Sequence, residues 1–351
     1  MYKIIERKSN VSGLKCFKGN VFINQNNILY NNNVELIKDV EGYSFWFLYD
    51  SIYFHNNDGI EFLKVGNRIK EIETPLFPKS LTNNQVFCCI NFRRENRKWM
   101  WNLGMFDLES CSEARELPFE NYTIELVVAG VGIGYFDKNK ISALDIKESQ
   151  IKWELMLNQF EEVELQRVLG IYQDQLLVAC SNHLLLSIDV NTGGILHQWR
   201  ELKGFEVGSF YKDVLPDPTN FVLDKSASKL IGVFDTFYFE INLDSKEISY
   251  HQLKDELSKY GVSDFRPFNN NSFTPEHLFL TAHTYLEEVP NVDLSSVLSL
   301  NRKTKKVDWI HIFKDVGLGT NVPKITNTHL YQLDTEQTLH IFKKETTSTD
   351  V

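Results

Sequence analysis

The chain has 351 residues, of which 42% are hydrophobic and 24% charged, and its formal net charge is −10. A chain of this length and composition forms a soluble globular protein that needs no disulfide or metal for stability. It carries no basic stripe, and its longest nearly apolar run (residues 126–136) is too short to span a bilayer, so we expect neither a nucleic acid nor a membrane as partner.

Short apolar runs separated by polar turns follow one another along the whole chain, which is typical of strands. The first run is YKIIER at residues 2–7, and residues 14–37 have room for four very short strands. Later runs include SIYFH (51–55), QLLVA (175–179), LIGVF (230–234) and HLFLT (277–281). Only residues 253–260 predict a helix, ended by Gly261. The pattern therefore predicts an all-β fold.

A hairpin pattern recurs within this series of strands. ISALDIKESQIKW (141–153) and VLSLNRKTKKVDW (297–309) each place an Asp or Asn after an apolar run and a Trp eight residues later. Related segments surround Asn31, Gly66, Asp107, Asp189, Asn242 and Asp334. A repeat of about 40–50 residues with four short strands per unit predicts a β-propeller.

The chemistry of this pattern is local. The Asp or Asn side chain can accept hydrogen bonds from the backbone amides of the turn that follows it. The aromatic residue after the turn then lies on the outer strand of the unit, where it can pack against the next unit. The aromatic residues in this position are Trp153, Trp199, Tyr250 and Trp309.

Residues 144–153, 188–199 and 300–309 resemble the repeats of quinoprotein-like (PQQ-repeat-type) β-propellers. This resemblance implies a single propeller domain over residues 1–351. We expect seven four-stranded blades, with eight left open, and a last blade closed by the N-terminal strand at residues 1–8. Residues 344–351 are expected to be a disordered tail. The superfamily contains cofactor enzymes, assembly scaffolds and binding proteins, so the resemblance implies fold more firmly than function.

The adjacent cysteines Cys88 and Cys89 bear on the choice among these functions. Quinoprotein enzymes carry such a pair as a disulfide against the cofactor, but here both lie in a predicted strand, where packing explains them better. We therefore expect no cofactor and a non-catalytic member. The odd count of five cysteines and the absence of an apolar signal core predict reduced thiols in the cytoplasm.

Three further groups of residues have the composition of possible sites. His277, His283 and Glu287 form a weak metal candidate, for which half-exposed strand histidines are the better explanation. The glycines at 130–134 lack the residues of a phosphate loop and indicate close strand packing or a bulge. Exposed rings among Trp46, Trp99 and Trp101 could stack on sugars, although packing between blades is favoured. No nucleophile elbow or HExxH motif is present.

The preferred hypothesis is a monomeric, non-enzymatic binding protein that docks a protein partner. Long acidic loops predict a contact patch that favours a basic partner, and a narrower version is a bacterial immunity or inhibitor protein that neutralises a basic toxin. The alternative is an enzyme or sugar-binding protein with a site at the mouth of the propeller channel. The predicted partner-binding residues are Asp217, Tyr285, Glu287, Glu288 and Asp293.

Overall fold

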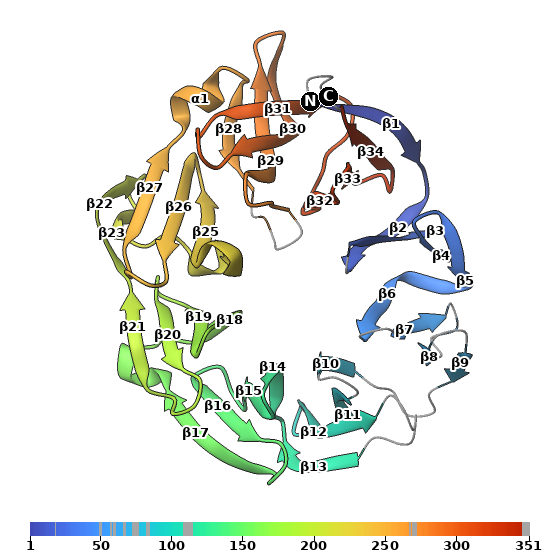
Figure 1. Ribbon diagram of the computed structural model, residues 1–351, viewed down its shortest axis with the longest axis vertical. Helices are drawn as coiled ribbons and strands as arrows, with labels where there is room; N and C mark the ends of the chain where they lie inside the picture. Colours follow the sequence, from blue (N-terminus) through green and yellow to red (C-terminus); the bar gives the residue numbers. More distant parts are fainter. Residues whose placement is uncertain are drawn as a thin grey trace, which may run out of the picture. The chain divides into compact units, whose positions relative to one another are not determined.

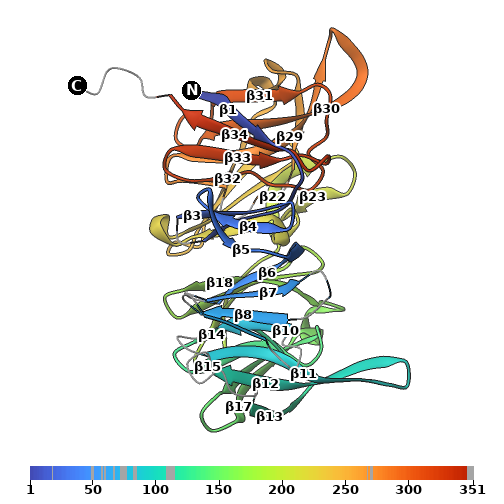
Figure 2. The same cartoon turned by 90° about the vertical axis from the view of Figure 1, so that its right-hand side faces the viewer.

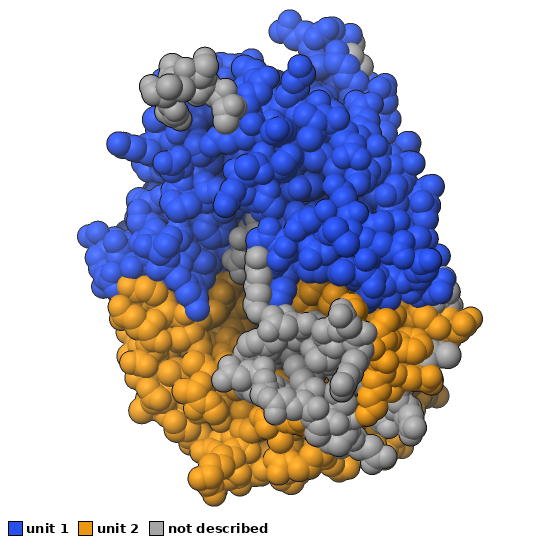
Figure 3. All heavy atoms as spheres, turned by 45° about the vertical axis from the view of Figure 1, so that its right-hand side comes forward, with its two compact units in different colours: residues 1–43, 202–351 blue, residues 44–201 orange. Residues whose placement is uncertain are grey.

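The computed structural model describes residues 1–17, 19–48, 51–56, 58, 61–65, 68–71, 77–81, 85–107, 115–266, 268 and 272–345. The fold is all-β: within the described residues, eight four-stranded sheets form the blades of a propeller and one further sheet has two strands (Figure 1). Eight is the larger of the two blade counts that the sequence left open. The chain divides into two compact units, one of residues 1–43 and 202–351 and one of residues 44–201 (Figure 3).

Unit 1 holds four of the blades. Their strands, in sheet order, are β2 (Val11–Phe17), β3 (Asn20–Gln25), β4 (Ile28–Asn31) and β5 (Val34–Ile37); β24 (Phe221–Asp224), β25 (Lys229–Phe234), β26 (Phe237–Asn242) and β27 (Ile248–Gln252); β28 (Val262–Phe265), β29 (His277–Leu286), β30 (Val289–Asn301) and β31 (Val307–Phe313); and β1 (Tyr2–Lys8), β34 (Leu339–Lys344), β33 (His329–Leu333) and β32 (Lys324–Ile325). The two-stranded sheet is β22 (Glu201–Val207) with β23 (Tyr211–Val214).

Unit 2 holds the other four blades, the first of which begins at the boundary between the units. Their strands are β6 (Val40–Leu48), β7 (Ser51–Asn56), β8 (Glu61–Val65) and β9 (Arg68–Glu71); β10 (Phe77–Leu81), β11 (Gln85–Glu95), β12 (Lys98–Asp107) and β13 (Arg115–Glu120); β14 (Thr123–Val128), β15 (Val131–Tyr135), β16 (Lys140–Asp145) and β17 (Gln150–Met156); and β18 (Leu165–Tyr172), β19 (Gln175–Cys180), β20 (Leu185–Asp189) and β21 (Ile195–Trp199).

Helical structure is confined to short connectors. The predicted helix is confirmed as α1 (Lys254–Ser258), after which Gly261 takes a φ of +70°. The other connectors are 3₁₀ turns, η1 (Leu157–Phe160), η2 (Pro218–Asn220) and η3 (Lys225–Ala227). Among the described residues, no helix is both long and apolar enough to cross a membrane.

The N-terminal strand closes the last blade, as the sequence predicts. β1 pairs antiparallel with β34, from Tyr2 opposite Lys344 to Lys8 opposite Leu339. Residues 344–351 are predicted as a disordered tail, but Lys344 is the last residue of β34, and residues 346–351 lie outside the described part of the chain.

The capped turn of the repeated hairpin is present at the atomic level. The Asp189 carboxylate accepts hydrogen bonds from the amides of Asn191 and Thr192 at 2.9 and 2.8 Å. The Asn242 and Asn301 side chains bind the corresponding amides of their own turns at 2.9 and 3.0 Å respectively. Each of these turns joins the third strand of a blade to the fourth.

Asp334 is the exception in this series. It follows β33 and caps the turn that leads to β34. β33 and β34 are the two middle strands of the last blade, since β1 is its outer strand. The last blade therefore has no outer hairpin, and the hairpin at Asn31 belongs to a separate blade formed by β2–β5. The described fold therefore has one outer hairpin fewer than it has blades, and of the two blade counts that the sequence predicts, eight is confirmed.

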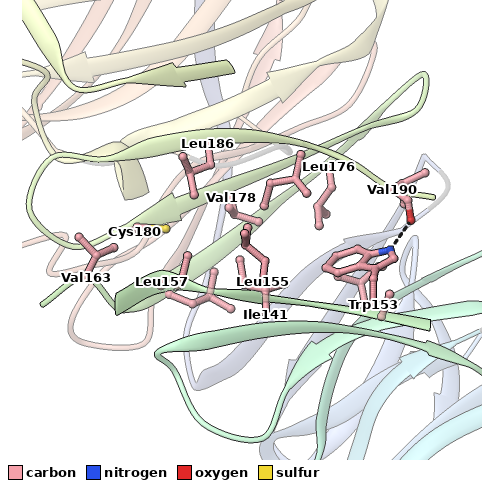
Figure 4. Close-up of a cluster of buried hydrophobic side chains, with 14 of the residues drawn as sticks. Ile141, Trp153, Leu155, Leu157, Val163, Leu176, Val178, Cys180, Leu186 and Val190 are labelled. Carbon is pink, nitrogen blue, oxygen red and sulfur yellow. Dashed lines mark hydrogen bonds between the residues drawn. The ribbon is translucent and has the colours of Figure 1, made fainter. Parts of the chain in front are cut away.

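The aromatic residue of the repeat packs between blades. Trp153 on β17 donates its indole N–H to the carbonyl of Val190 in the next blade at 2.9 Å, and its ring is buried in a cluster shared by the two blades (Figure 4). A Cβ atom at Gly193, whose φ is +74°, would lie 2.7 Å from the Trp153 ring. Trp309 likewise contacts Tyr2 and Phe342 of the last blade, at ring distances of 5.4 and 5.2 Å.

The glycine-rich segment serves close strand packing, as expected. A Cβ atom at Gly134 would lie 1.9 Å from the backbone oxygen of Thr123 on the neighbouring strand. Cys88 and Cys89 are both buried in β11 with free thiols, and burial raises the pKa of Cys88 to about 12. Neither feature offers a reactive group to solvent.

Candidate functional site

Four of the five predicted partner-binding residues lie together on one projecting hairpin. β29 and β30 form the two central strands of their blade, but β28 pairs only as far as Thr284 and β31 only as far as Ser295. Beyond these positions residues 285–293 continue as a two-stranded extension, seen at the upper right of Figure 2. We refer to residues 285–293 as the acidic ribbon.

The acidic ribbon presents an aromatic ring and a pair of carboxylates to solvent. Tyr285 is 49% exposed, and Glu287 and Glu288 at the turn are also exposed. Val292 on the returning strand is 42% exposed. An exposed ring beside charged groups is a composition expected at a protein contact, since Tyr is one of the residue types enriched among those that dominate binding energy.

The fourth ribbon residue, Asp293, takes part in a network at the base of the ribbon. Its carboxylate oxygens lie 2.8 and 3.0 Å from Nδ1 of His283. The other ring nitrogen of His283 accepts a hydrogen bond from Nε of Arg266 at 3.1 Å, and Nη1 of Arg266 donates to the carbonyl of Gly319 at 2.7 Å. Because Nε2 accepts from Arg266, His283 carries its proton on Nδ1 and donates it to Asp293. Asp293 therefore orients the ribbon and leaves Glu287 and Glu288 as its outward carboxylates.

The fifth predicted residue, Asp217, has a local role. It precedes η2, and its carboxylate accepts hydrogen bonds from the amide and the hydroxyl of Thr219 at 2.9 and 2.8 Å. This is ordinary helix capping. Among the described residues, no contact joins Asp217 to the acidic ribbon.

The histidines of the metal candidate lie at separate points of β29. A spacing of six residues along a strand corresponds to about 20 Å. Nε2 of His277 is 2.9 Å from the carboxylate of Asp308, whereas His283 is paired with Asp293. Glu287 is at the turn of the ribbon, beyond both. The described part of the chain contains no group of three His, Cys, Asp or Glu side chains able to hold a metal ion.

A cleft of about 1330 Å³ lies elsewhere in unit 1. It is lined by turns and strand ends of three consecutive blades, including the loops at residues 273–277 and 325–329 and the turn at Asn32 and Asn33. Tyr2 packs edge-on against Phe279 at 5.7 Å and beside Trp309 within its wall, and His277 with Asp308 lies among its lining residues. No local sequence pattern predicts this cleft, because its wall joins Tyr2 of the N-terminal strand to Phe279 and Trp309, more than 270 positions away.

The exposed tryptophans differ from expectation. Trp99 is 61% exposed, so packing between blades is wrong for this residue. Trp101 is partly buried and stacks on Phe92, with ring centroids 6.3 Å apart. The side chain of Trp46 lies outside what the structure describes. Trp99 and Trp101 belong to a second projecting hairpin, formed by β11 and β12.

Comparison with known proteins relates the chain to others by fold only. No protein-family model matches the sequence, and comparison with curated proteins finds no match. Sqt1 from Saccharomyces cerevisiae aligns with a TM-score of 0.59 at 10% identity, over 98% of this chain and 98% of that one. The computationally designed protein Ika8 aligns with a TM-score of 0.55 at 8% identity, over 96% and 97% of the two chains.

BamB from Moraxella catarrhalis covers 98% of this chain and all of its own at 12% identity, but its TM-score of 0.47 is too low to support a closer relation. Identities of this size show the fold alone. The comparisons therefore agree with the propeller fold found in the structure, while the quinoprotein-like family stays a prediction from the repeats.

Proposed function

We propose that the protein is a non-catalytic docking protein that binds a basic protein partner through the acidic ribbon. The observation that carries this proposal is the extension of residues 285–293 beyond the neighbouring strands, which presents Tyr285, Glu287 and Glu288 to solvent. A rigid blade that supports a projecting contact element is a common basis for recognition. The net charge of −10 adds long-range attraction for a cationic partner.

The narrower form of this proposal is a bacterial immunity or inhibitor protein that neutralises a basic toxin domain. Such a partner would be recognised by complementary charge at the ribbon, and association would be accelerated by electrostatic steering. A toxin-binding role predicts that cells expressing the partner alone stop growing, and that cells expressing the partner together with this protein grow normally.

Reversing the charge at the end of the acidic ribbon tests the docking proposal. We expect Glu287→Lys/Glu288→Lys to weaken capture of the partner from the native cell extract at least about tenfold, because both carboxylates become repulsive. For the partner so identified, the association rate of the unmodified protein should fall steeply as salt is raised, since salt screens exposed charges. Surface plasmon resonance at several salt concentrations measures both effects.

The matched control is Glu161→Lys/Glu162→Lys, which reverses a second exposed pair of adjacent glutamates in unit 2. It makes the same change in net charge and should leave affinity within about twofold of the unmodified protein. Equal losses in the two double variants, or an association rate independent of salt, would show that the ribbon is not the contact.

The cleft in unit 1 favours a second candidate function, the binding of an uncharged polar ligand such as a sugar. Aromatic rings with amide, hydroxyl and imidazole groups are suited to stacking on sugars and hydrogen bonding to their hydroxyls. Glycan-array binding that His277→Ala abolishes would support this candidate, since His277 lines the cleft and is remote from the turn of the acidic ribbon.

A further inference from the structure

A second hairpin projects from its blade in unit 2. The pairing of β10 with β11 ends at Cys89, and that of β13 with β12 ends at Asn102. Residues 91–101 therefore continue as a two-stranded ribbon past the end of β13, at the lower right of Figure 2. Asn96 and Arg97 both have positive φ, 48° and 67°, as the tight two-residue turn of a twisted hairpin requires. We refer to residues 91–101 as the cationic ribbon.

The two faces of the cationic ribbon differ in chemistry. Arg94 lies opposite Trp99 in the register, so these side chains share a face. Alternation along each strand adds Phe92 and Trp101 to that face, which the stacking of their rings confirms. This front face consists of aromatic residues and one arginine.

The rear face is internally neutralised. Nε of Arg93 is 2.7 Å from the carboxylate of Glu95, and the same guanidinium also pairs with Glu120. Asn91 donates to Glu116 at 2.8 Å. These contacts satisfy the rear face and hold the ribbon against β13.

Two rings of the front face remain accessible to solvent. Trp99 is 61% exposed and Phe92 is 42% exposed. A tryptophan side chain offers about 150–250 Å² for burial, and Trp and Arg are the residues most enriched among those that dominate binding energy. Exposed rings clustered on a projecting element thus indicate a contact surface.

Charge indicates what this surface contacts. Within the described residues, no ion pair is found for Arg94, Arg97 or Lys98, whereas Arg93 is already neutralised. Arg94 on the apolar face and Arg97 in the adjoining turn are therefore complementary to an acidic, partly apolar protein segment. A nucleic acid or an anionic membrane fits less well than a short acidic segment, because its continuous negative charge would extend beyond Arg94 and Arg97 to the carboxylates of Glu95, Glu116 and Glu120 in a chain of net charge −10.

We propose that the cationic ribbon is a second docking surface, which binds an acidic protein segment with Trp99 buried against its apolar side chains and Arg94 and Arg97 paired with its carboxylates. This surface has the opposite charge to the acidic ribbon and lies in the other unit. It therefore goes beyond the proposed function and can fail or hold independently of it.

The experiment uses fluorescence anisotropy with a labelled peptide of three Glu-Leu-Asp-Gly repeats and a control peptide of three Lys-Leu-Lys-Gly repeats. We expect the full chain to bind the acidic peptide, Arg94→Glu/Arg97→Glu to weaken binding at least about tenfold, and Trp99→Ala at least about fivefold. The matched controls are Lys147→Glu/Lys152→Glu, which makes the same change in net charge, and Ile151→Ala, all at exposed positions of another blade of the same unit, and they should leave binding unchanged. Circular dichroism verifies that all variants are folded.

Several results would overturn the proposal. One is equal binding of the basic and acidic peptides, and another is loss of binding in the Lys147→Glu/Lys152→Glu and Ile151→Ala controls as large as in the ribbon variants. Tighter binding to a short oligothymidylate, or to vesicles containing phosphatidylserine, would assign the ribbon to nucleic acid or membrane. No detectable binding of the acidic peptide at low salt would also count against it.

Discussion

Replacing Trp153 with alanine should lower the free energy of unfolding by about 3–5 kcal/mol, the range typical of a large aromatic residue removed from a core. The Trp153 side chain is only 8% exposed and is buried against the adjacent blade. Gly193 approaches the ring so closely that the neighbouring turn is shaped around it. The cavity left by alanine would therefore not collapse easily. Denaturant unfolding followed by circular dichroism measures the loss.

Two further variants separate the causes of this effect. Trp153→Phe keeps a ring but removes the hydrogen bond to Val190, so a smaller loss of about 1–2 kcal/mol is expected from the unpaired carbonyl and reduced packing. Trp99→Ala removes the same side chain from an exposed site and should change stability by no more than about 0.5 kcal/mol. A loss for Trp153→Ala as small as that for Trp99→Ala would contradict a packing role between blades.

Trp153 also shows why the repeat could be recognised from the sequence. The cap on the turn and the ring on the outer strand are set by residues within about ten positions of one another, and local hydrogen bonding decides their conformation. Asp189, Asn242 and Asn301 confirm the turn in three blades. The sequence predicted closure of the last blade by the N-terminal strand, but it left seven or eight blades open, because the number of blades depends on pairing between segments as distant as Tyr2 and Lys344. The residues within a single hairpin do not determine such long-range pairing.

The candidate sites likewise combine features set by neighbouring residues with features set by contacts between distant segments. Tyr285, Glu287 and Glu288 lie together because one hairpin joins them. Whether that hairpin projects depends on where β28 and β31 end, which its own residues do not encode. The exposure of Trp99 follows in the same manner from the end of β13. The pairing of His283 with Arg266 and the wall of the cleft likewise result from contacts between distant segments.

A buried ion pair between two blades of unit 1 gives the other large effect. Asp224 on β24 is 2% exposed and Arg302, in the turn after β30, is 7% exposed, and their charged groups are 2.8 Å apart. Arg302 also donates to the carbonyl of Thr274 at 2.9 Å. Asp224→Ala leaves the guanidinium buried without its counter-charge, so we expect a loss of about 3–5 kcal/mol in the free energy of unfolding.

The control for this prediction replaces both charges. Asp224→Leu/Arg302→Met fills the site with apolar side chains of similar size, and it should recover a large part of the stability that Asp224→Ala loses. The recovery distinguishes an unpaired charge from a simple cavity. The double variant could instead lose as much free energy of unfolding as Asp224→Leu and Arg302→Met lose when their separate losses are added. In that case packing, and not charge, would be the dominant cause.

The ion pair between Asp224 and Arg302 also makes the free energy of unfolding depend on pH. Burial raises the pKa of the Asp224 carboxyl, but the Ser226 hydroxyl and the Arg302 guanidinium outweigh burial and hold this pKa below its usual value. Nearby, burial is likewise outweighed at Glu240, where Lys229, Tyr238 and Lys305 bring the pKa to about 2.

A carboxyl whose pKa is lower in the folded state stabilises the fold above its unfolded pKa, and this contribution is lost as the pH falls towards the folded value. The stability difference between the unmodified protein and Asp224→Ala should therefore be full above about pH 5 and shrink as the pH falls below about 4. A difference that stayed constant over that range in urea unfolding experiments would show that the Asp224 carboxylate does not act through its charge.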